Sequence, residues 1–168
     1  MTKSATNSED HASPVHLLHR AGQCADDLFS TAVGDGQLTP RQYIVLRCAA
    51  EADDPSQTAL VETTGIDRST LADIVRRLVE RDLLERERTR RDARMYAVRV
   101  TEKGMDALNR ARPAEAQSEQ QLVDAVAPED REAFFRSLRR IIDKFGPVSS
   151  ARVTPKTDGA LRTTETAI

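Results

Sequence analysis

The chain has 168 residues, of which 39% are hydrophobic and 31% are charged, enough for one ordinary domain or a domain with an oligomerisation element. Its formal net charge of −2 excludes a general attraction to polyanions, so any nucleic-acid binding must come from a local cationic patch. Two cysteines exclude a disulfide framework, and the absence of a signal-peptide core or of about 18 consecutive apolar residues predicts a cytoplasmic protein with no membrane contact.

Polar segments stand at both ends of the chain. Residues 1–13 and 147–168 hold too few apolar side chains to order themselves, so we interpret both as disordered tails. Between them, apolar residues first recur at helical spacing from Val15 to Ala32, and Gly34 ends the pattern. This pattern predicts the first helix.

A strong start signal marks the second helix. Thr39 can be its N-cap, Pro40 occupies the first turn, where a missing N–H does no harm, and Gln42 completes a capping box. After this helix, Ser56 can cap a short third helix, and Gly65 is expected to make a tight turn.

An amphipathic helix follows, from about residue 68 to residue 81. Its apolar stripe consists of Leu71, Ile74, Val75 and Leu78. The opposite face carries Arg68, Ser69, Thr70, Asp73, Arg76 and Arg77. A short helix, a glycine turn and a second amphipathic helix make a helix-turn-helix, whose second helix enters the major groove of DNA. We therefore expect its first residues to meet base edges and its later arginines to reach the backbone, while an ordinary solvated surface helix is the alternative.

An arginine-rich hairpin is predicted directly after that helix. Residues 84–89 and 95–101 form two extended runs, and the alternation of Tyr96, Val98 and Val100 predicts a half-buried strand. Residues 67–99 contain ten arginines against seven acids, a surplus of three, so the rest of the chain carries −5. The arginine-rich connection between the two runs is typical of a wing that reaches a narrow minor groove, where the negative potential favours arginine. The alternative is that the charges only keep the hairpin soluble.

The wing connection supplies four further candidate DNA-binding residues. Arg94 is predicted to insert into the minor groove, and Asp92 to orient its guanidinium through a charge-assisted hydrogen bond. Arg90 and Arg91 are expected to contact phosphates.

The remaining helices are predicted to be an oligomerisation element. Thr101 can cap a helix to about residue 125, which Pro113 should kink or interrupt. Pro128 opens a last helix that ends at Gly146. Its apolar side consists of Phe134, Leu138, Ile141, Ile142 and Phe145. Together with the first helix, this is more apolar surface than the small central lobe could cover, which favours a dimer over packing within one chain.

The sequence resembles the multiple-antibiotic-resistance regulator (MarR) family of winged-helix transcription factors over about residues 15–146. Three runs carry the resemblance: LTPRQYIVLRCAA, GIDRSTLADIVRRLVERDLLER and RRDARMYAVRVTEKG. Its most specific parts are the DRSTL start of the amphipathic helix, the D-x-R at Asp92 to Arg94 and the T-x-x-G at Thr101 to Gly104.

The resemblance implies a mainly α fold with a small β-hairpin. A winged helix-turn-helix lobe would occupy residues 37–100, and an all-helical dimerisation region would occupy residues 14–36 and 101–146. Family members usually have a long continuous helix where Pro113 stands. The implied function is a transcriptional regulator, most simply a repressor, that binds a pseudo-palindromic double-stranded DNA operator as a homodimer.

The resemblance also implies a small-molecule effector, often an aromatic or phenolic acid or its thioester. It would bind between the dimerisation region and the winged lobe, where the first two helices would line the pocket. The polar candidates are His16, His19, Arg20, Tyr43 and Arg47, which could equally be ordinary surface or interface residues.

Other controls and other classes of protein have less support. Cysteine-based redox sensing would use Cys24 or Cys48, but both fall in apolar helical patterns. A metal site would rest on His16 and His19 alone, so we expect none. A winged helix that docks onto proteins would not require arginines on both helix and hairpin. No nucleophile with a base, phosphate loop or carboxylate cluster points to an enzyme, and we expect no cofactor.

Overall fold

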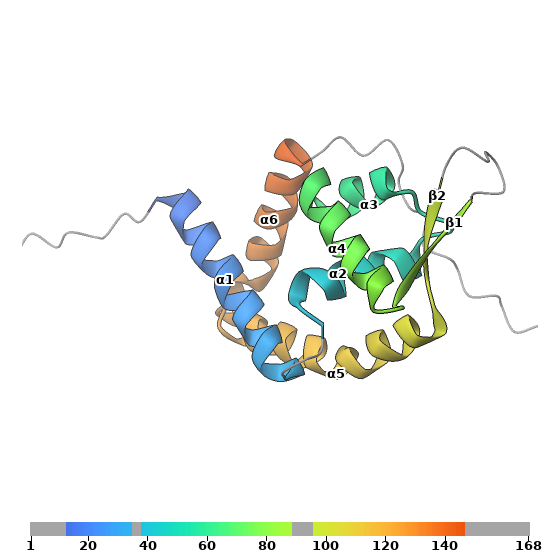
Figure 1. The fold of residues 1–168 in the computed structure, drawn as a ribbon. Helices are drawn as coiled ribbons and strands as arrows, with labels where there is room; N and C mark the ends of the chain where they lie inside the picture. The colour runs from blue at the N-terminus through green and yellow to red at the C-terminus, as the bar shows by residue number, and fades with distance from the viewer. Residues whose placement is uncertain (1–12, 35–37, 89–95, 147–168) are drawn as a thin grey trace, which may run out of the picture.

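The computed structural model describes residues 13–34, 38–88 and 96–146, which form six α-helices, one 3-10 turn and a two-stranded antiparallel sheet (Figure 1). In chain order these are α1 (Pro14–Val33), α2 (Pro40–Glu51), α3 (Gln57–Thr64), α4 (Arg68–Glu80), β1 (Leu84–Arg88), β2 (Tyr96–Val100), α5 (Glu102–Asp124), η1 (Pro128–Asp130) and α6 (Arg131–Phe145). The mainly helical fold class predicted from the sequence is confirmed. Apart from Ser13, both predicted tails lie outside the described residues.

The predicted helix starts are confirmed by their side-chain caps. Thr39 and Gln42 form the reciprocal capping box at α2, and the Ser56 hydroxyl accepts from the Ala59 N–H at 3.1 Å. Gly65 ends α3 with φ +69°, a left-handed conformation that glycine adopts without steric cost. This turn sets α4 against α3 as a helix-turn-helix.

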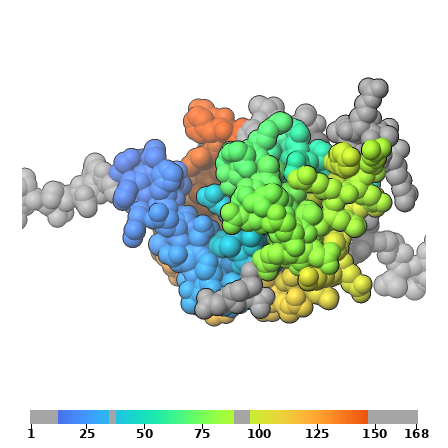
Figure 2. Space-filling view, in the orientation of Figure 1, coloured from blue at the N-terminus to red at the C-terminus, as the bar shows by residue number. Residues whose placement is uncertain are grey.

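The core lies where α2, α3, α4 and α5 meet the inner face of the hairpin. The whole apolar stripe predicted for α4 is buried, and Leu46, Leu60 and Leu108 are at most 1% exposed. Because each buried leucine contributes about 1.5–3 kcal/mol, this packing fixes α4 on the lobe by its apolar side. Its polar side lies at the surface, in the green area at the front of Figure 2.

The hairpin pairs Leu84 with Val100 and Arg88 with Tyr96. The expected burial of alternate residues in β2 is wrong: Tyr96 is 52% exposed, while Ala97 and Val98 are both 1% exposed. The reason is a contact on the other edge of β2. The Val98 N–H donates to the Pro55 carbonyl at 2.9 Å, and Ser56 forms a bridge with Ala97, so this neighbouring segment covers Ala97.

Helix α5 continues through Pro113, so the interruption considered from the sequence is absent. Pro113 and Asn109, whose carbonyl loses its usual N–H partner, both lie at exposed positions, where water can replace the missing bond. Helix α1 packs on α5, whereas α6 has no buried residue. In Figure 1, α1 and α6 project from one end of α5, away from the hairpin. None of the described helices is both long and apolar enough to cross a membrane.

Candidate nucleic-acid interface

The first turn of α4 is built around Asp67. This N-cap carboxylate accepts from the Ser69 and Thr70 backbone N–H groups at 3.1 and 3.0 Å and from the Ser69 hydroxyl at 2.6 Å. These hydrogen bonds, led by that of Ser69, hold the pKa of Asp67 well below its usual range. The carboxylate therefore stays charged and fixes the start of the helix, where Arg68 and Ser69 are exposed and Thr70 is half-buried.

The later cations of α4 form ion pairs along its exposed face. Asp73 accepts from Arg76 at 2.6 Å and from Arg77 at 2.8 Å, and Arg76 also donates to Glu80 at 2.6 Å. The two arginines lower the pKa of Asp73, mainly through the Arg76 hydrogen bond. Since ion pairs this exposed contribute little to stability, phosphates can take the place of Asp73 and Glu80 at small cost. The structure thus brings all six α4 candidates onto one helix, while Arg90, Arg91, Asp92 and Arg94 lie outside the described residues.

An ion-pair network that the sequence did not reveal fixes the base of the hairpin. Arg99 donates from Nε and Nη2 to the two carboxylate oxygens of Asp54, at 2.7 and 2.8 Å, and it also pairs with Glu87. Asp54 adopts φ +52°, a strained conformation that aspartate tolerates better than most residues. The network therefore connects the loop before α3 to both strands. Asp54 and Arg99 are 45 residues apart, so no local pattern could have revealed their pairing.

The five effector candidates do not form one cluster. Tyr43 is buried, and its hydroxyl donates to Glu115 of α5, which also accepts from Arg47. Burial and the Glu115 carboxylate raise the pKa of the Tyr43 hydroxyl. His16 and Arg20 are exposed elsewhere on α1, whereas His19 borders a cavity.

That cavity lies between α1, α2 and the turn before α4. Its volume is about 610 Å³. The lining residues are Leu18, His19, Gly22, Gln23, Asp26, Arg41, Ile44, Gly65, Ile66 and Asp67. Because Asp67 caps α4, this cavity borders the group that fixes the start of that helix.

The two cysteines lie in different environments within the described ranges. Burial raises the pKa of the Cys48 thiol, which opposes formation of the reactive thiolate. Cys24 is exposed on α1. No group of three or more histidine, cysteine, aspartate or glutamate residues in these ranges could hold a metal ion.

Comparison with known proteins identifies this arrangement. Residues 37–95 match the model of the MarR family. The transcriptional repressor NicR of Pseudomonas putida is 30% identical over 128 residues, which cover 76% of this chain and 81% of NicR. The chain belongs to the MarR family. It is a DNA-binding transcriptional regulator of that family and not an enzyme.

Two solved MarR family structures share its fold. The PcaV regulator of Streptomyces coelicolor, in complex with its natural ligand, has a TM-score of 0.71 and 32% identity over 79% of this chain and 93% of PcaV. BpsR of Bordetella bronchiseptica, whose DNA binding is regulated by 6-hydroxynicotinic acid, has a TM-score of 0.72 and 30% identity over 80% of this chain and 96% of BpsR. The helices and hairpin of this chain therefore match the winged-helix fold of solved MarR family structures.

Proposed function

We propose that this MarR family chain is a homodimeric repressor of a pseudo-palindromic operator, and that a small aromatic acid or its thioester releases it from DNA. The observation that carries the proposal is the start of α4, where Asp67 fixes a helix turn that presents Arg68 and Ser69 to solvent. Arginine can read guanine, and serine suits bases or phosphates.

The proposed DNA contacts extend from that turn to the wing. Arg68, Ser69 and Thr70 would meet base edges in the major groove. Arg76 and Arg77 would exchange Asp73 for phosphates, with Asp73 holding them on the exposed face before DNA arrives. The wing would contribute Arg90, Arg91, Asp92 and Arg94, with Arg94 in the minor groove.

The proposed dimer uses residues 14–36 and 101–146, leaving residues 37–100 as the DNA-binding lobe. Its support is apolar surface that one chain leaves uncovered. Val15 and Leu17 of α1 are 64% and 55% exposed, and Ile142 and Phe145 of α6 are 65% and 76% exposed. Large apolar side chains exposed together on a helix face are typical of an interface between proteins.

The effector class is supported by the cavity beside Asp67 and by the relatives. PcaV has a natural ligand, and an aromatic acid regulates DNA binding by BpsR. In this chain, His19 and Arg41 are basic residues on the cavity wall, and Ile44 and Ile66 can contact an aromatic ring. Of the other candidates, Tyr43 and Arg47 would have to exchange Glu115 for the ligand. A ligand here acts only if it binds one spacing of the two recognition helices better than another.

The test begins with selection of duplexes from random-sequence DNA by the purified chain. We expect a site with two half-sites roughly 10 bp apart, bound with a steep salt dependence. Thermal-shift screening with aromatic carboxylates and acyl thioesters should then find a compound that also releases the selected duplex. Failure to distinguish the selected duplex from random DNA rejects the repressor proposal, and a stabilising compound that leaves the complex intact rejects the effector mechanism.

A further inference from the structure

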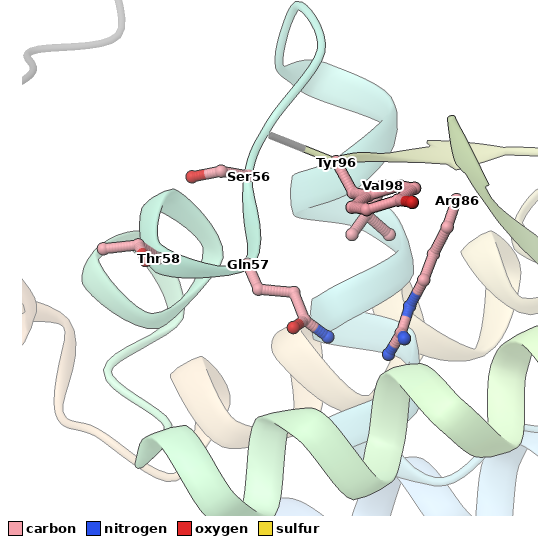
Figure 3. A pocket seen from close by; sticks show the side chains of 6 residues that line it. All are labelled: Ser56, Gln57, Thr58, Arg86, Tyr96 and Val98. Atoms are coloured by element: carbon pink, nitrogen blue, oxygen red, sulfur yellow. The ribbon is translucent and has the colours of Figure 1, made fainter. Parts of the chain in front are cut away.

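A cleft separates the start of α3 from the inner face of the hairpin (Figure 3). Its volume is about 550 Å³, and its lining residues are Ser56, Gln57, Thr58, Arg86, Tyr96 and Val98. Figure 3 shows the Gln57 and Arg86 side chains extending toward the same side of the cleft, whereas the Ser56 and Thr58 side chains point away from them. An amide from one element and a guanidinium from the other therefore border the same space.

Gln57 and Arg86, two of the side chains that border this space, have donors that the described residues leave unpaired. The Gln57 Nε2 atom is buried and has no hydrogen-bond partner. Arg86 makes no ion pair with the described residues, although glutamates flank it in the sequence, because alternate residues of a strand point to opposite faces. Arg86 instead shares the inner face with Val98, its cross-strand partner. A buried donor without an acceptor costs free energy, which a turn of the Gln57 amide toward an anion in the cleft would recover.

The start of α3 adds backbone donors. Ser56 caps the Ala59 N–H at 3.1 Å, and its carbonyl accepts from Leu60 at 3.0 Å. The N–H groups of Gln57 and Thr58 precede these bonds and have no partner within the helix. No acidic side chain lines the cleft within the described part of the chain, so backbone and side chains together favour a negative ligand.

We propose that this cleft holds a phosphate of the DNA backbone. The inference rests on the proposed function, which puts the helix-turn-helix in a major groove and the wing in the adjacent minor groove. One sugar–phosphate strand separates two such grooves, so the protein must straddle that strand between its two reading elements. The cleft lies between those elements. Gln57 and Arg86 would bind the phosphate oxygens, and Tyr96, which is exposed, would contact the neighbouring sugar.

The first test removes the cation. Arg86→Ala should weaken binding about three- to tenfold on the selected duplex and on random duplex alike, because a phosphate contact carries no base information. The slope of log K against log salt should become shallower by about 0.9, the value for one lost phosphate contact. Arg110→Ala removes an exposed arginine of α5 and should change neither quantity.

The second test reverses the electrostatics with little change in shape. Gln57→Glu puts a carboxylate beside the phosphate and should lower the affinity for the selected duplex and for random duplex more than Gln57→Ala does. Asn109→Asp makes the same change of charge at an exposed position of α5 and should leave affinity unchanged. Circular dichroism and the melting temperature of each variant separate a binding defect from unfolding.

The inference is overturned if Arg86→Ala keeps the parent's affinity and salt slope, or if it weakens only the selected duplex, because the side chain would then read bases. Its failure is distinguishable from that of the proposed function. If the parent selects no sequence, the specific-repressor proposal fails, while the salt slopes measured on random duplex still decide whether the cleft binds a phosphate.

Discussion

At the scale of single residues, Asp67 controls the start of the recognition helix. Its depressed pKa means that the native chain holds this carboxylate ionised where the unfolded chain would protonate it. The resulting stability is fully present above the usual aspartate pKa of 3.8 and is lost as pH falls below that value.

We therefore expect Asp67→Asn to retain a side-chain acceptor for the helix start but to lose this part of the acid dependence. Urea unfolding at pH 7 and at pH 3 measures it: the loss of unfolding free energy between the two should be smaller in the variant than in the parent. An equal loss would mean that the Asp67 hydrogen bonds contribute nothing in solution.

Gly104, in the first turn of α5, lies against the segment between α4 and β1, where there is no room for a side chain. A Cβ atom built there would lie 2.1 Å from the Leu83 carbonyl oxygen and 2.8 Å from a Val100 methyl group. Because a backbone carbonyl cannot give way as a flexible side chain can, Gly104→Ala should destabilise the chain by at least about 1–3 kcal/mol.

Gly22→Ala is the matched control for Gly104→Ala. Gly22 also lies within a helix, but a Cβ there would meet nothing within 4 Å, so alanine should stabilise α1 by up to about 1 kcal/mol. Urea denaturation gives both values, and a Gly104→Ala variant as stable as the parent would contradict the close approach at Leu83.

At the scale of elements, the Asp54–Arg99–Glu87 network fixes the orientation of the hairpin relative to the helices of the lobe. Arg99→Lys keeps the charge but loses the two parallel hydrogen bonds to Asp54, so the wing should be held less firmly. DNA affinity should fall several-fold with the salt slope unchanged, since Arg99 itself would touch no phosphate. A shallower slope in fluorescence-anisotropy titrations would instead make Arg99 a direct DNA contact.

The Tyr43–Glu115 hydrogen bond joins α2 of the lobe to α5. Tyr43→Phe leaves Glu115 with Arg47 alone and should cost about 1–2 kcal/mol at pH 7. The raised pKa means that the native chain keeps the Tyr43 proton where the unfolded chain loses it. The parent should therefore lose stability as pH rises above 10.0, and the variant should lose less. Urea denaturation at pH 9 and 10.5 measures the fall in the free energy of unfolding for parent and variant. A steeper fall in the variant would contradict this prediction.

The same elements show what a sequence can and cannot predict. The caps at Thr39, Ser56 and Thr101 were predictable because their partners lie three residues away. Tyr43 and Glu115 are 72 residues apart, so their bond depends on how α2 crosses α5. The burial of Ala97 likewise depends on the Pro55–Ser56 segment at the edge of β2 and not on alternation within the strand.

At the scale of the whole molecule, α6 is the least supported element of a single chain. It has no buried residue, and its main packing partner is η1, the turn that precedes it. Short helices are marginal in water unless an apolar face is packed. An amphipathic helix of 15 residues in this position therefore needs a second surface, which we expect a second copy of the chain to provide.

Ile142→Arg tests that expectation, because it puts a charge in the middle of the exposed apolar face of α6. If the face is buried in a dimer, an unpaired guanidinium there should raise the dimer dissociation constant by about 100-fold or more. Sedimentation should then change from about twice the 18.6 kDa chain mass to the monomer value, with DNA binding weakened in parallel. Asp143→Arg introduces the same side chain about 100° further round the helix, on its polar side, and should keep the dimer. A parent that sediments as a monomer, or an Ile142→Arg variant that stays dimeric, would mean that something other than a second copy covers α6.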